Sequence, residues 1–383
     1  MKTAALVLSL LVAISASAAS IAPDVDRAVA RDGRAQVIVS LRAPAAAGKA
    51  AFDEITRTRD AVLGTFEGDD FRVIATWGTI PGFAGEVTGS GLAKLAANPA
   101  VSKVDLDVDG TGGLEQSIPI VGANTVHAMG FRGAGVTMAI LDTGIDSDHP
   151  DLEGRIVDEA CFCRNSDGSG CCPNGQTSQF GRGAAEDDHG HGTHVAGIAG
   201  SRGARAKRSR FGDRQVVAEG MAPEVKFVVV KVLDRNNAFA GSAQVISGLD
   251  WVLQNHKEVR ALNMSLLTNA HFTGDCDTAA AFAENFASVI NGLRTNGTAV
   301  FACSGNTGSL TSIGAPACVH NTISVGATLD AANITNSCGV SGVDEVACFS
   351  DSDTTLDLLA PGTRINSARR GGGTTIFSGT SMA

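Results

Sequence analysis

Short apolar runs alternate with amphipathic stretches along the second part of the chain, from about Gln116 onward. Runs of this length predict buried strands, and the stretches between them predict helices. We expect strands at 136–141, 225–233, 262–266, 299–302 and 322–326, and helices at 243–255 and 278–295. Strands that alternate with helices form a parallel sheet covered on both faces, so the predicted fold class is α/β. In such sheets, functional residues gather at the carboxyl ends of the strands.

The first part of the chain predicts a smaller domain of another kind. Its apolar pattern indicates strands at 36–41, 71–76, 83–88 and 101–106, with helices at 51–66 and 91–97. The order β-α-β-β-α-β is that of a ferredoxin-like α+β domain. The run Thr111-Gly112-Gly113 then provides a flexible exit. We therefore expect one domain at 19–113 and a second at 114–383.

The N-terminus predicts export. Lys2 precedes an apolar stretch from Ala4 to Ile14, and Ala16-Ser17-Ala18 supplies small residues for cleavage. This is the pattern of a secretory signal peptide over residues 1–18, too short to remain as a membrane span. No later apolar run reaches spanning length, so we expect a secreted protein, extracellular or periplasmic, with no membrane attachment after signal removal.

Composition narrows the classes of function. The 383 residues are 44% hydrophobic and 18% charged, which is an ordinary globular balance. The formal net charge of −10 argues against nucleic acid as a partner, because nothing would offset repulsion from phosphates.

Nine cysteines in an exported protein predict disulfides, and their odd number leaves at least one unpaired. We expect two bridges within the cluster formed by Cys161, Cys163, Cys171 and Cys172. Thiolates at this spacing could instead bind zinc, which is the alternative. Two further predicted pairs are Cys338 with Cys348 and Cys276 with Cys318. Cys303 is left over, and we expect it to be buried as a small apolar residue.

Three short segments carry candidate chemistry. Residues 140–146 place Asp142 at the end of a strand, residues 189–197 place histidines at the start of a helix, and residues 377–383 present Ser381 after a glycine-bearing turn. Taken alone, an Asp at a strand end is often a helix cap or a turn residue, and a Gly-Thr-Ser sequence is often only a turn. Together, and in the order Asp, His, Ser, they resemble the subtilisin family of serine proteases.

The resemblance implies the roles of these residues. A serine hydroxyl becomes a good nucleophile only when an imidazole accepts its proton, and a carboxylate then orients that imidazole. Ser381 is thus the expected nucleophile, His191 the base and Asp142 its orienting partner. His194 would be structural and His189 exposed. Asn306 matches the family's oxyanion asparagine, and the family needs no cofactor for catalysis.

The same resemblance implies a groove for an extended peptide. Leu262 to Leu266 look like the family's substrate-flanking strand, which binds a peptide backbone by adding it as a further strand. The expected substrate-binding residues are Ser265, Leu266, Ser304 and Gly305. Groove likeness suggests tolerance for a large apolar residue before the scissile bond. However, Leu267 and Thr268 stand where the family has glycines, and a leucine there would narrow the groove.

The first domain resembles the family's inhibitory propeptide through residues 81–84 and 101–104. By this likeness the domain is the chain's own intramolecular inhibitor, and its tail lies in the active site until it is cleaved near Gly113 to Gln116. We expect a monomer that acts on proteins or peptides. Gln116 and Asp151 match two ligands of a family calcium site, so structural Ca²⁺ is a further expectation.

Two points remain open on sequence alone. The alternative to a peptidase is a pseudoprotease that keeps the groove but only binds peptides, whereas a lipase is disfavoured because Ser381 lacks a Gly-x-Ser-x-Gly elbow.

The sequence also stops two residues after Ser381, where the family continues into a helix. We therefore expect a C-terminally incomplete fragment. In it, Ser381 would lie on a loose, inactive tail, and the sheet would expose an apolar patch.

Overall fold

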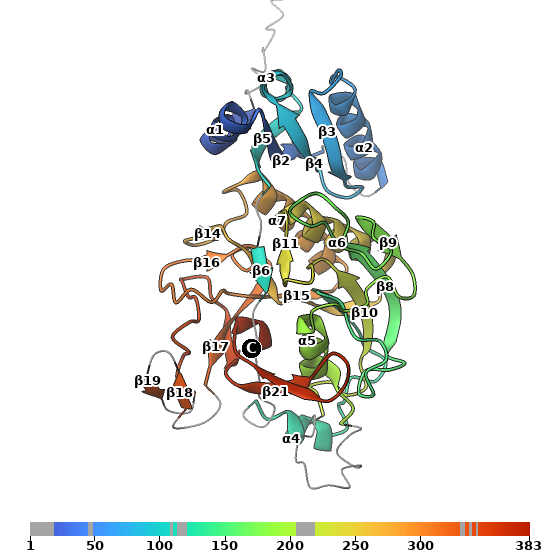
Figure 1. Ribbon diagram of the computed structural model, residues 1–383, viewed down its shortest axis with the longest axis vertical. Helices are drawn as coiled ribbons and strands as arrows, with labels where there is room; N and C mark the ends of the chain where they lie inside the picture. Colours follow the sequence, from blue (N-terminus) through green and yellow to red (C-terminus); the bar gives the residue numbers. More distant parts are fainter. Residues whose placement is uncertain are drawn as a thin grey trace, which may run out of the picture.

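Two sheets, each with a core of its own, organise the chain (Figure 1). The computed structural model describes residues 19–44, 49–107, 110–112, 121–203, 219–329, 334–336, 339–341 and 344–383. The predicted signal peptide at 1–18 lies outside the described residues. The smaller sheet belongs to residues 19–107 and forms the upper lobe of Figure 1, above two helices of the larger lobe.

The small domain has the predicted β-α-β-β-α-β order. Strands β2 (Arg34–Leu41), β3 (Phe71–Thr76), β4 (Gly82–Thr88) and β5 (Val101–Leu106) pair antiparallel in the order β5-β2-β4-β3. Helices α2 (Lys49–Leu63) and α3 (Gly89–Ala97) provide the two crossovers. The sequence pattern missed two elements, β1 (Ser20–Ile21) and α1 (Pro23–Asp32). Helix α1 is polar, with Val25 as its one fully buried residue, so its apolar signal is weak.

The larger sheet has eight strands, and all its neighbours pair in parallel except the last two. Its order is β20 (Leu358–Pro361), β17 (Ile323–Thr328), β15 (Ala299–Cys303), β12 (Val259–Met264), β7 (Thr137–Asp142), β10 (Lys226–Lys231), β8 (Ile156–Phe162) and β9 (Ser178–Phe180). The predicted parallel sheet is confirmed, and it carries one antiparallel strand at its edge. The link from β8 to β9 contains no crossover helix, so β9 can only turn back antiparallel.

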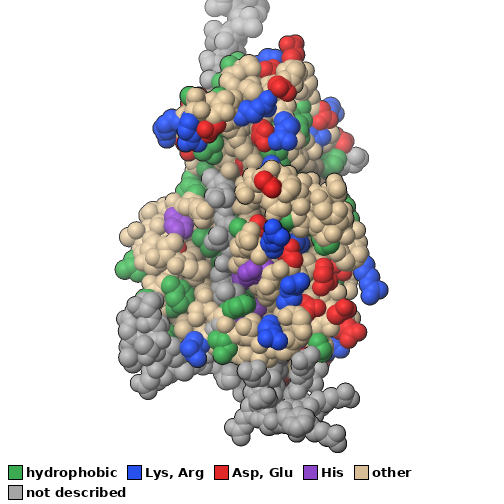
Figure 2. All heavy atoms as spheres, viewed as in Figure 1, with side chains coloured by type: hydrophobic (Ala, Val, Ile, Leu, Met, Phe, Trp, Pro, Cys, Tyr) green, Lys and Arg blue, Asp and Glu red, His purple; other side chains and the backbone are tan. Residues whose placement is uncertain are grey.

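Helices cover both faces of this sheet, as predicted. Successive residues of β7 divide between the faces: Leu141 packs in the core under α6 (Ser242–Asn255) and α7 (Ala281–Thr295). Ile140 packs in the core under α5 (His191–Gly200). None of the described helices is long and apolar enough to cross a membrane. On the face shown in Figure 2, acidic and basic side chains are interspersed over both lobes.

The cysteines of the cluster pair with one another. The bridges are Cys161–Cys172 and Cys163–Cys171, so these thiols are not available as zinc ligands. Cys276–Cys318 is also confirmed, and Cys303 is a buried free thiol whose pKa burial raises to about 12. Cys348 is disulfide-bonded, but its predicted partner Cys338 lies outside the described residues.

We predict that removing the Cys276–Cys318 bridge destabilises the larger domain strongly. The bridge joins residues 42 apart in sequence, for which loop-closure entropy gives about 4 kcal/mol. The variants Cys276→Ser and Cys318→Ser should lower the free energy of unfolding in guanidinium by equal amounts, and the double variant should lower it no further. Additive losses would instead indicate that each side chain acts through its packing.

Candidate active site

A fully buried carboxylate and a fully buried imidazole form the centre of the site. Asp142, at the end of the central strand β7, is 0% exposed, and so is His191, the first residue of α5. Asp142 Oδ1 lies 2.6 Å from His191 Nδ1 and also accepts the Thr143 amide at 2.7 Å. With the Nδ1 proton directed at Asp142, Nε2 carries the lone pair, as a general base requires.

Two glycines allow this close approach. Gly144 turns the chain after Asp142 with a φ of +107°, a conformation that other residues rarely adopt. Gly192 follows His191, and a methyl group there would collide with the Gly144 carbonyl and lie 3.0 Å from the side chain of Asp142. The end of β7 and the start of α5 can therefore come this close only when residue 192 is glycine.

Ser381 is buried and held on both sides, and the expected loose tail is wrong. It lies in a short 3-10 helix, η2 (Thr380–Met382), that packs beside α5. The Ser381 hydroxyl donates to the Ser265 carbonyl at 3.1 Å, and the Ser265 hydroxyl donates to the Ser381 carbonyl at 2.6 Å. A cavity of about 290 Å³ lies beside it, lined largely by apolar side chains of the sheet and α5.

His194 holds the segment that leads to Ser381. The hairpin of β21 (Ile365–Ala368) and β22 (Thr374–Phe377) precedes η2. His194 Nε2 lies 3.2 Å from the carbonyls of Ile365 and Thr375, and its ring is 4.7 Å from the ring of Phe377. Burial lowers the pKa of His194 to about 3, so the imidazole stays neutral. This geometry agrees with a structural role, and His189 is exposed as expected.

Asn306 follows β15 and faces the turn that carries the serine. Its Oδ1 accepts the Thr380 amide at 2.8 Å and the Thr380 hydroxyl at 3.1 Å, which fixes the orientation of the side-chain amide. Gly305 before it has a φ of +126°, and a side chain there would collide with the buried Asp351. Asp351 in turn accepts the Thr307 and Ser309 amides at 2.9 and 2.8 Å, and so orders the loop.

A short segment from the end of the small domain lies in the predicted groove. Strand β6 (Gly110–Gly112) pairs antiparallel with β11 (Ala238–Phe239) on one side and β13 (Leu266–Thr268) on the other (Figure 1). Gly112 faces Leu266, so the chain runs toward Ser265 and Ser381. Of the other predicted groove residues, Ser304 donates its hydroxyl to the Asp351 carbonyl, and the Gly305 amide donates to Thr380 at 3.3 Å.

The predicted calcium site stays a prediction. Gln116 lies outside the described residues, and Asp151 is fully buried with its carboxylate 3.8 Å from His149 Nδ1. Among the described residues, no group of three or more His, Cys, Asp or Glu side chains could hold a metal ion.

Two buried charges that support the site were not predicted. Asp187 accepts the Gly190 amide at 2.8 Å, the Thr193 amide at 3.0 Å and the Thr143 hydroxyl at 2.9 Å. It therefore caps the start of α5 and ties it to the aspartate strand. Lys231, at the end of β10, donates to the Thr143 carbonyl at 2.8 Å and pairs with Asp188 at 2.6 Å. One sequence signal could have identified Asp187. It is an acidic residue that lies shortly before a helix whose third residue is threonine.

We predict that Asp187→Ala lowers activity by displacing His191. Loss of a helix cap costs about 0.5–2 kcal/mol, and here the capped residues position the base. The complete protein should show a lower kcat for peptide hydrolysis and a lower unfolding temperature, with Asp187→Asn recovering part of both. Asp148→Ala is the control, because that side chain is exposed, whereas Asp188 is paired with the buried Lys231. Equal kcat for Asp187→Ala and the native protein would contradict the assignment.

Comparison with known proteins agrees with this geometry. The subtilase family model matches residues 133–383. The chain is 31% identical to Subtilisin from Bacillus pumilus over 70% of this chain and 81% of that protein. It is 30% identical to Subtilisin E from Bacillus subtilis and 33% identical to an extracellular serine proteinase from Thermus, over 76% and 79% of this chain. The chain spans 64% and 63% of those two relatives. On this evidence, the chain belongs to the subtilase family.

Proposed function

We propose that the protein is the precursor of a secreted serine endopeptidase, in which Ser381 attacks the substrate and residues 19–113 act as the inhibitory propeptide. The observation that carries the proposal is the three-stranded arrangement of β11, β6 and β13. An extended peptide segment lies there as a middle strand and runs toward a buried Asp–His pair and a serine. A groove of this kind binds main chains, which is what a peptidase requires.

The proposed reaction uses these groups in the following way. His191 Nε2 removes the proton of the Ser381 hydroxyl as Oγ attacks the peptide carbonyl carbon, and Asp142 stabilises the imidazolium. The carbonyl oxygen becomes an oxyanion near the Asn306 side-chain amide and the Ser381 backbone N–H. One such donor contributes about 3–4 kcal/mol. His191 then protonates the leaving amine, the acyl-enzyme forms, and water releases the acid by the reverse proton transfers.

The alternative of a peptide-binding pseudoprotease is disfavoured. Such a protein would need only the groove, whereas here Asp142 is paired with His191 and Asn306 contacts the turn that carries Ser381, which supports a catalytic role. A relative bears the name extracellular serine proteinase, which supports both the activity and export. The three disulfides between described cysteines also fit an oxidising compartment.

Two carboxylates of the small domain support its role as an inhibitor. Helices α6 and α7 have no side-chain cap of their own, because their N-cap residues are Gly241 and Ala280. Asp107 accepts the Ser242 hydroxyl at 2.7 Å and the Ala243 amide at 3.1 Å at the start of α6. Asp105 accepts the Ala281 amide at the start of α7. Each carboxylate faces the positive end of a helix dipole.

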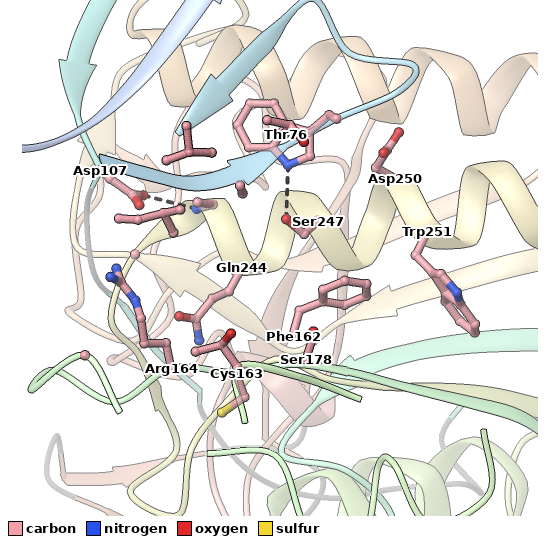
Figure 3. A pocket seen from close by; sticks show the side chains of 18 of the residues that line it. Thr76, Asp107, Phe162, Cys163, Arg164, Ser178, Gln244, Ser247, Asp250 and Trp251 are labelled. Atoms are coloured by element: carbon pink, nitrogen blue, oxygen red, sulfur yellow. Dashed lines mark hydrogen bonds between the residues drawn. The ribbon is translucent and has the colours of Figure 1, made fainter. Parts of the chain in front are cut away.

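Apolar packing between the two domains adds to the binding that these helix caps provide. Ile38, Trp77 and Ile80 of the small domain belong to the same core as α6 and α7, and the Trp77 indole donates to Ser247 at 3.0 Å. A cavity of about 480 Å³ remains between the lobes. Figure 3 shows Asp107 and Arg164 at one end of it and Asp250 and Trp251 at the other. The small domain is thus held both at the face of its sheet and at its C-terminal tail. Cleavage near Gly113 to Gln116, which lie outside the described residues, would free the groove.

The catalytic proposal predicts the behaviour of two variants of the complete, matured protein. Ser381→Ala should abolish casein hydrolysis and fluorophosphonate labelling while the fold is retained. His191→Ala should slow hydrolysis by roughly 10⁴-fold or more, because the serine loses its base. Unchanged hydrolysis by Ser381→Ala would remove the assignment, whereas labelling without hydrolysis of any peptide would favour the pseudoprotease.

The inhibitory proposal predicts that Asp107→Ala weakens binding of the small domain. Loss of one cap costs about 0.5–2 kcal/mol, which corresponds to roughly a 2- to 30-fold higher Kd. The measurement is inhibition of the mature enzyme by added residues 19–113 with and without the substitution. Asp69→Ala is the matched control, because that side chain is 93% exposed. Equal inhibition by the native and Asp107→Ala segments would show that the cap contributes nothing.

A further inference from the structure

A narrow slot opens beside Ser381 between two segments of the chain. Strands β12 and β15 pair up to Met264 and Ala302, and the segments that follow them, 265–268 and 304–306, then separate. Gly314 closes the gap between them: its amide donates to the Ser304 carbonyl at 3.1 Å. The next residue, Ala315, accepts the Thr268 amide at 2.7 Å. The slot therefore has two backbone walls and a glycine floor.

The register of the bound strand shows which substrate residue meets the slot. Gly112 faces Leu266, and in an antiparallel pair the following peptide position faces Ser265. The Ser381 hydroxyl donates to the Ser265 carbonyl, so this is the position whose carbonyl carbon lies within reach of the nucleophile. A residue bound there lies beside Ser265, and Asn306 contacts the turn on the other side of Ser381. A side chain of that residue that points between segments 265–268 and 304–306 meets Gly314.

Leu267 already occupies this gap. Leu266 packs in the main core, and the next side chain of a strand points to the opposite face. Leu267 is only 7% exposed and lies flat against the floor: a methyl group built on Gly314 would be 2.5 Å from Leu267 Cδ1 and 3.0 Å from its Cβ. A large substrate side chain would have to displace a leucine that is itself buried.

We propose that Leu267 determines the specificity of the enzyme and restricts the residue before the scissile bond to glycine, alanine or serine. This inference rests on the proposed peptidase function, and it replaces the expectation of a large apolar residue at that position. The chain's own sequence agrees with a shallow slot, since the predicted cleavage region follows Gly112 directly and begins with a glycine.

The test compares two peptide p-nitroanilides that differ only in alanine or phenylalanine before the anilide. With the complete, matured protein, kcat/KM should be at least about 10-fold higher for alanine, since a filled pocket rejects added carbon atoms by such factors. Leu267→Gly should raise the ratio of kcat/KM for phenylalanine to that for alanine at least about 10-fold, with Leu267→Ala between the native protein and Leu267→Gly. Leu358→Ala, on the edge strand β20, is the control and should leave the ratio unchanged.

Rates are expressed per active site titrated with a fluorophosphonate, so that partial misfolding of a variant does not imitate a change of specificity. Equal kcat/KM for the two substrates in the native protein, or an unchanged ratio in both Leu267 variants, would overturn the role of Leu267 and leave the peptidase standing. Failure of Ser381 to be labelled, with neither substrate cleaved, would instead refute the proposed function itself.

Discussion

The contact between Asp142 and His191 is the constraint on which the rest of the larger domain depends. Both side chains are fully buried, and a buried carboxylate is costly unless it is paired and hydrogen-bonded. The 2.6 Å contact requires the central strand to end where a helix begins, with glycines at positions 144 and 192. Asp187 and Lys231 both bind Thr143 and so hold the end of β7 against the start of α5. The charged groups around Asp142 and His191 therefore form one connected network.

The small domain depends on the larger one in a different way. Its carboxylates, Asp105 and Asp107, satisfy helix N-termini that have no cap within their own segment. Burial raises the pKa of both carboxyl groups, because contact with the larger domain removes them from bulk water. Recognition therefore occurs at two separate places, the helix starts and the groove, and the two are joined by the few residues that precede β6.

The sequence was most informative where chemistry is local. Short patterns predicted the motifs around Asp142, His191 and Ser381, the helices α6 and α7, and the two cysteine pairs within 161–172, because each depends on residues close in sequence. The caps of α6 and α7 could not, because a carboxylate at position 105 reaches an amide at 281 only through the tertiary fold. Ser381 was expected on a loose tail, but contacts with Ser265 and the hairpin beneath it hold it in place. Edge strands such as β20, whose leucines are half exposed, gave no clear pattern.

The shortness of β11 and β13 has a consequence for the maturation proposed above, in which the middle strand β6 leaves the groove. Departure of the middle strand leaves two strand edges with unpaired backbone groups, and such edges promote aggregation when they are long and flat. Here they contain only two and three residues. In the proposed function they are long enough to align one peptide beside Ser381, yet they are too short to template a growing sheet, so a short groove would combine peptide binding with resistance to aggregation.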